Sequence, residues 1–147
     1  LQHESNGKDG TDSRSLNLAY VKPILRFGSA DPDGFHLSLA PRFYTYVGDM
    51  SDNPDMANYR GWGDLAVRMG WEDGLMLGTT FRIGERFENP TAQFDLSYPV
   101  HRLPLPWCDK AADNVYLFLQ VFTGYGICLR EYNESTTDIR LGLSISR

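Results

Sequence analysis

Apolar and polar residues alternate with a period of two along most of this 147-residue chain. In the segment 35–47, FHLSLAPRFYTYV, the residues Phe35, Leu37 and Leu39 share one face, whereas Arg42 lies on the other. Successive side chains of a β-strand point to opposite faces of the sheet, so this pattern predicts a strand with one apolar side. The same alternation recurs in the segments 59–71, 74–86, 91–102, 114–126 and 137–145.

The length of these strands separates a membrane protein from an ordinary soluble sheet. They run to roughly 11 to 14 residues, whereas strands of globular proteins typically have about 5 to 6 and membrane-spanning strands about 9 to 11. Aromatic residues gather near the predicted strand ends, as in interfacial belts, and no helical segment is predicted to cover an apolar face. The pattern therefore favours an all-β, antiparallel up-and-down transmembrane β-barrel. A soluble barrel of lipocalin type would alternate in the same way and is the alternative.

Eight strands are predicted when a short stub at residues 1–6 is counted. Their polar faces carry charges of both signs, which can pair inside a filled barrel rather than line a wide pore. The length suits a single domain spanning residues 1–147. The formal charge of −5 and the pI of about 5.1 argue against a nucleic-acid-binding surface, which should be basic. The chain has no apolar run long enough for a transmembrane helix.

The opening stretch, LQHESNGKDGTDSRSLN, contains a candidate hydrolytic site. His3 and Ser5 stand two residues apart, so they share one face of a strand with their Cα atoms about 6.6 Å apart. Asn17 follows on the next predicted strand and can lie beside His3 in an antiparallel pair. These residue types suit nucleophilic acyl transfer, with Ser5 as nucleophile, His3 as base and Asn17 orienting the imidazole. The backbone N–H of Gly7 can serve the oxyanion.

An ordinary polar strand end would carry the same residues, because His-x-Ser is a common chance pattern. One feature favours a catalytic role for these residues. The trio shares its face with apolar residues, so on a membrane barrel it would face lipid, where unpaired polar groups are costly and tend to be functional.

Several motifs together resemble the outer-membrane phospholipase A family over essentially the whole chain. They are HESNG, DSRSLN, DNPD at 52–55, LSYPV at 96–100 and TGYG at 123–126. The resemblance implies a twelve-stranded barrel of the Gram-negative outer membrane, of which about eight strands are represented here. It implies a calcium-dependent hydrolase that cleaves acyl esters of phospholipids and lysophospholipids, with A1 and A2 activity, and that works as a homodimer.

The family's serine, histidine and asparagine match Ser5, His3 and Asn17, on the lipid-facing surface of the barrel. Its calcium ligands match the backbone carbonyl of Lys8, which replaces an arginine, the side chain of Ser13, and the Asp52 carboxylate. Such oxygen ligands suit Ca²⁺. A merely solvated acidic rim on these loops is the other interpretation.

The resemblance also has departures. We expect the chain to be the C-terminal portion of a longer barrel that does not insert stably alone, because unpaired strand edges are not viable in lipid. The ending LSISR lacks the terminal aromatic that such barrels usually carry. Cys108 and Cys128 are separated by a strand of about a dozen residues, too far for a disulfide, so we predict two free thiols. The alternatives to an enzyme are a catalytically inactive structural or pore-forming outer-membrane barrel and a soluble lipid-binding barrel.

Overall fold

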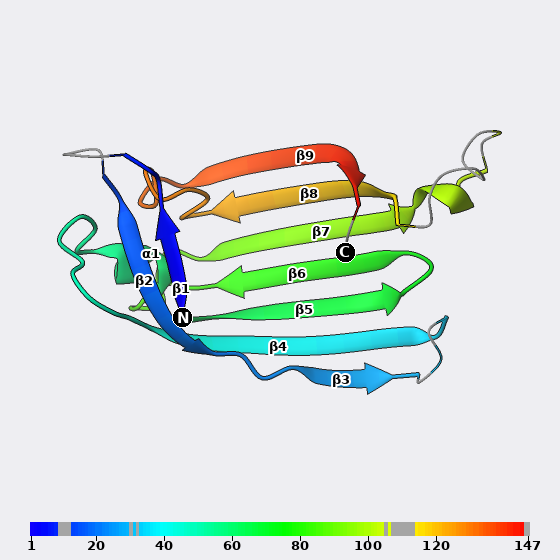
Figure 1. The fold of residues 1–147 in the computed structure, drawn as a ribbon, viewed down its shortest axis with the longest axis horizontal. Helices are drawn as coiled ribbons and strands as arrows, with labels where there is room; N and C mark the ends of the chain where they lie inside the picture. Colours follow the sequence, from blue (N-terminus) through cyan, green and yellow to red (C-terminus); the bar gives the residue numbers. More distant parts are fainter. Residues whose placement is uncertain (9–12, 30, 32, 105, 107–113, 146–147) are drawn as a thin grey trace.

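The chain folds into one antiparallel β-sheet, and the prediction of an all-β up-and-down architecture is confirmed (Figure 1). The computed structural model describes residues 1–8, 13–29, 31, 33–104, 106 and 114–145. Its strands are β1 (Gln2–Ser5), β2 (Ser15–Val21), β3 (Leu25–Gly28), β4 (Phe35–Tyr46), β5 (Gly63–Trp71), β6 (Met76–Arg82), β7 (Thr91–Pro99), β8 (Tyr116–Gly124) and β9 (Thr136–Ser144).

Nine strand segments occupy eight positions in the sheet. β2 pairs with residues 43–46 of β4, and β3 pairs with residues 36–39 of the same strand. Pro23 lies between the two segments and has no N–H to donate, which accounts for the interruption of the ladder. The order is β1-β2-β4-β5-β6-β7-β8-β9, with every pair antiparallel, as the count of eight expected.

The two faces of the sheet differ as the alternation predicts. Large apolar side chains such as Phe43, Phe81 and Leu141 are exposed on the outer face. The inner face carries the polar set, in which Arg42 forms an ion pair with Asp64. Charges of opposite sign therefore do pair on the inner face.

The end of the sheet that carries the longer loops contains a feature that the pattern did not predict. Residues 59–62 were expected in a strand, but α1 (Met56–Arg60) is a short helix and β5 begins only at Gly63. Met, Ala and Arg favour helix, and Gly61, at φ +61°, ends it in a backbone conformation that suits glycine. The side chain of Met56 is fully buried against Leu16 and Leu18. α1 therefore packs on the inner face, whereas the apolar side chains of the outer face stay exposed.

Most of the observed strands are shorter than expected, since β6 has 7 residues and β5, β7, β8 and β9 have 9 each, whereas β4, with 12, lies within the predicted range. β7 ends at Pro99, and η2 (Val100–Arg102) is a 3₁₀ turn where the alternation had predicted further strand. Cys128 is a free, exposed thiol, whereas Cys108 lies outside the described residues. Among the described residues, no helix has the length and apolar character needed to cross a membrane.

Candidate active site

The β1–β2 hairpin carries the three residues singled out in the opening stretch and brings two of them, His3 and Asn17, into contact. In its register His3 lies opposite Asn17 and Ser5 lies opposite Ser15. His3 Nδ1 and Asn17 Oδ1 are 2.8 Å apart, a hydrogen-bond distance. His3, Ser5 and Asn17 are all exposed, whereas their strand neighbours Leu16 and Leu18 are buried. The trio therefore occupies the outer face of the sheet.

The turn after Ser5 places a backbone donor at its hydroxyl. The N–H of Gly7 donates to Ser5 Oγ at 3.1 Å. Gly7 has a φ of +66° and an added Cβ would meet no atom within 4 Å, so the backbone conformation rather than crowding requires glycine. The Asn6 side-chain oxygen accepts the N–H groups of Lys8 and Arg14 at 3.2 and 3.1 Å, which closes the hairpin.

The pairing of His3 determines what the trio can do chemically. Because Asn17 presents its amide oxygen, Nδ1 of His3 is the nitrogen that carries the proton in this arrangement. Nε2 is then the basic nitrogen and can accept the proton of a serine hydroxyl. Ser5 lies two residues along the same strand face and is the candidate nucleophile of the hairpin.

Two of the three predicted calcium ligands lie together. Ser13 Oγ is 3.4 Å from Asp52 Oδ2, although the residues are 39 positions apart in sequence. Lys8 stands in the same hairpin loop, where its N–H is held by Asn6. Hydroxyl, carboxylate and carbonyl oxygens are the donors that Ca²⁺ takes, so this donor set fits the ion. Within the described part of the chain, no group of three or more His, Cys, Asp or Glu residues could hold a metal.

Asp49 lies in the same loop as Asp52 but is engaged locally. The Ser51 backbone N–H and hydroxyl each lie 2.9 Å from its carboxylate oxygens. These hydrogen bonds hold the pKa of Asp49 below its ordinary value. Asp9 and Asp12, which belong to the predicted acidic rim, lie outside the described residues.

The sequence alone did not identify the residues that support the trio from the inner face of the sheet, Glu4 and Arg60. Glu4 faces inward between His3 and Ser5, and both of its oxygens accept hydrogen bonds from Arg60, at 2.8 and 3.1 Å. Burial opposes the charged form of Arg60, yet the Glu4 carboxylate outweighs that cost and raises the pKa of Arg60 above its ordinary value. The period-two pattern put Glu4 on the inner face, but nothing local indicated a partner 56 residues away.

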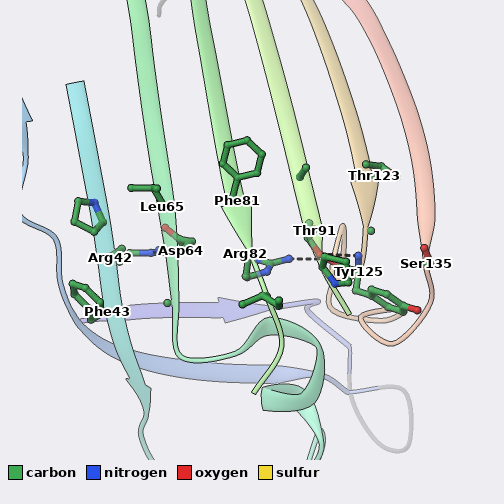
Figure 2. A pocket seen from close by; sticks show the side chains of 16 residues that line it. Arg42, Phe43, Asp64, Leu65, Phe81, Arg82, Thr91, Thr123, Tyr125 and Ser135 are labelled. Carbon is green, nitrogen blue, oxygen red and sulfur yellow. Dashed lines mark hydrogen bonds and ion pairs between the residues drawn. The ribbon is translucent and has the colours of Figure 1, made fainter. Parts of the chain in front are cut away.

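A groove of about 790 Å³ lies elsewhere, on the outer face across β4 to β8 (Figure 2). Phe43, Leu65 and Phe81 line it, and Figure 2 shows the Arg42–Asp64 contact beside them. Neither His3 nor Ser5 lines this groove, and its lining contains no histidine. The groove therefore offers no histidine base for acyl transfer, and the carboxylate in its lining, Asp64, is paired with Arg42. The hairpin is the better candidate for the active site.

Comparison with known proteins agrees with this geometry. The chain is 27% identical over 144 residues to phospholipase A1 of Escherichia coli K12, an alignment covering 98% of this chain and 43% of the relative. It thus spans less than half the length of that relative.

Three solved structures have the same fold. Outer membrane phospholipase A from Escherichia coli aligns with a TM-score of 0.75 at 26% identity, covering 96% of this chain and 48% of that one. A structure of an asparagine-to-alanine active-site mutant of the same enzyme aligns equally well. The outer membrane phospholipase dimer of Salmonella typhi, with bound calcium, aligns with a TM-score of 0.74 at 25% identity, over the same shares of the two chains.

The sequence profile of one family, described as phospholipase A1, matches residues 1–145. Together with the outward-facing His3–Asn17 pair beside Ser5, this match leads to one conclusion: the chain belongs to the phospholipase A1 family.

Proposed function

We propose that this chain carries the catalytic strands of a calcium-dependent outer-membrane phospholipase, as the C-terminal portion of a longer barrel. The observation that carries the proposal is the His3–Asn17 hydrogen bond of 2.8 Å on the strand face that also bears Ser5. The family match and the active-site asparagine of the related Escherichia coli enzyme support the same roles. The substrates are acyl esters of phospholipids and lysophospholipids, cleaved with A1 and A2 specificity.

The proposed reaction is a two-step acyl transfer. Ser5 Oγ attacks the ester carbonyl carbon as its proton passes to Nε2 of His3. The Gly7 N–H, which donates to Ser5 Oγ in the resting structure, turns its hydrogen bond to the oxyanion that forms beside it. His3 then gives the proton to the leaving alkoxide oxygen, the ester C–O bond breaks, and an acyl-Ser5 remains. Water deprotonated by His3 hydrolyses that ester and restores Ser5.

Asn17 keeps the imidazole in the productive orientation throughout this cycle. An amide stabilises an imidazolium less than a carboxylate would, so additional charge stabilisation is needed at the oxyanion. The Lys8 carbonyl, Ser13 and Asp52 would hold Ca²⁺, which would supply that positive charge. The proximity of Ser13 Oγ to Asp52 Oδ2 supports this assignment. By analogy with the calcium-bound Salmonella typhi dimer, we propose that the active form is a homodimer in the Gram-negative outer membrane.

The test is release of fatty acid from mixed phospholipid–detergent micelles by the protein in its full natural length. We expect release in the presence of Ca²⁺, little with a chelator, and essentially none from a Ser5→Ala variant. The Ser15→Ala variant is a matched control, because Ser15 lies opposite Ser5 in the hairpin register. If a folded, dimeric wild-type protein releases no fatty acid, the alternative of a catalytically inactive barrel is correct.

A further inference from the structure

On the inner face of the sheet, the Glu4–Arg60 ion pair holds β1, the strand that carries His3 and Ser5. β1 has only four residues, and β2 is the one strand it pairs with in the described sheet. Its inward side chains, Gln2 and Glu4, alternate with the two candidate catalytic residues. Glu4 makes the two hydrogen bonds with Arg60, and its Oε1 also accepts the Gln2 amide at 2.8 Å.

The partner residue is fixed independently of β1. Arg60 ends α1, and its side chain is 9% exposed against 25% for Glu4. The backbone carbonyl of Arg60 accepts the hydroxyl of Tyr44, and the next carbonyl, of Gly61, accepts the hydroxyl of Tyr46 at 2.9 Å. Both tyrosines lie at the C-terminal end of β4, so the backbone that carries Arg60 is anchored to that strand.

The segment leading into Arg60 braces the rest of the hairpin in the same way. Asn53, which is fully buried, donates to the carbonyl of Ser15 at 3.0 Å. Met56 packs under Leu16 and Leu18. Residues 53–60 therefore back the inner face of both hairpin strands, and Glu4 is the point where this support reaches β1.

We propose that the Glu4–Arg60 pair is a positioning pair for the acyl-transfer site, an inference that rests on the function proposed above. Glu4 lies between His3 and Ser5, so any displacement or rotation of the strand at Glu4 moves both side chains together. The backbone ladder fixes the register of β1 against β2, and the two-point contact with Arg60 fixes how the outer face of β1 is turned. A planar guanidinium that holds both carboxylate oxygens restrains direction as well as distance.

The experiment uses the full natural-length protein with Glu4→Asp, Glu4→Gln and Arg60→Gln, and the Glu4→Gln/Arg60→Gln double variant. Asp keeps the carboxylate charge near Arg60 but is one methylene shorter. This variant therefore tests the position of β1 without removing the negative charge that neutralises Arg60. Arg140→Gln is the control, since Arg140 forms an ion pair with Asp138 on the remote strand β9, through one carboxylate oxygen and at a more exposed position. Heat-modifiable migration and resistance to protease measure the folded fraction of each variant.

Two activity readouts distinguish positioning from stability. We expect kcat per folded molecule to fall about 10- to 100-fold in Glu4→Asp and Glu4→Gln, with KM within about twofold of wild type, because small displacements at a reacting centre cost that much. The rate at which an alkylsulfonyl fluoride labels Ser5 should fall in parallel. The double variant should lose no more kcat than either single change to Gln, since both remove one contact.

The outcomes are distinct. A kcat per folded molecule that is unchanged in Glu4→Asp and Glu4→Gln overturns the inference, as does a loss in Arg140→Gln of equal size. Additive losses in the double variant also overturn it. A folded wild-type protein without activity or Ser5 labelling removes the proposed function, and the positioning role with it.

Discussion

The His3–Asn17 hydrogen bond permits a quantitative prediction for Asn17→Ala. The two side chains lie 2.8 Å apart, directly opposite each other in the hairpin register. When His3 accepts the Ser5 proton, its ring becomes an imidazolium, and the hydrogen bond to the amide oxygen becomes charge-assisted. Hydrogen bonds to charged groups contribute about 1.5 to 3 kcal/mol. At about 1.4 kcal/mol per tenfold in rate, kcat should fall about 10- to 150-fold.

The measurement is fatty-acid release per folded molecule at saturating Ca²⁺ and substrate. Asn17→Asp keeps an acceptor oxygen opposite His3, so it should retain more activity than Asn17→Ala. Thr137→Ala is a control of the same kind, because Thr137 forms an exposed cross-strand hydrogen bond with Thr123 at 3.2 Å, on β8 and β9. A kcat for Asn17→Ala within about twofold of wild type would refute the orienting role.

Three further predictions concern the surroundings of the site. Asp52→Asn should raise the Ca²⁺ concentration needed for half-maximal activity at least about tenfold, because a carboxylate ligand is lost, and a calcium titration of fatty-acid release checks this. Met56→Ala should lower the free energy of unfolding by about 2 to 5 kcal/mol, because Met56 is fully buried in the cluster under the hairpin, and urea unfolding in detergent measures it. The hydrogen bond from Arg102 lowers the pKa of Asp73, at the opposite end of the sheet, so its stabilising contribution is present above the unfolded value of about 4 and is lost as pH falls through the lower folded pKa. Asp73→Asn should therefore reduce the decline of the urea midpoint on acidification.

The sequence predicted those parts of the fold that are encoded locally. Alternation located the strands because each side chain on a half-covered sheet must match one of two environments. It failed at Tyr59 and Arg60, which fit the period of the following strand yet belong to α1. The burial of Met56 against the hairpin, a contact between distant segments, decides the helix there.

The candidate site likewise contains a part that the sequence predicts locally and a part that it does not. His3, Ser5 and Asn17 lie within one hairpin, so strand geometry alone could place them on one face. That Ser13 and Asp52 belong to one site could be predicted only from the resemblance to a family, because 39 positions of sequence separate them. The Glu4–Arg60 contact joins two segments that share no pattern, and it became visible only in the folded structure.

β1 carries His3 and Ser5 on its outer face and the hydrogen-bonded Gln2 and Glu4 on its inner face. This arrangement makes the strand sensitive to a change of register. A slip of one residue in the pairing of β1 with β2 would exchange the two faces of β1. Gln2 and Glu4 would then point toward lipid, where a carboxylate is costly, while His3 and Ser5 would point at Arg60 and Arg42. Homologous strands should therefore tolerate many substitutions at Leu1, but they should keep the spacing of this segment residue for residue.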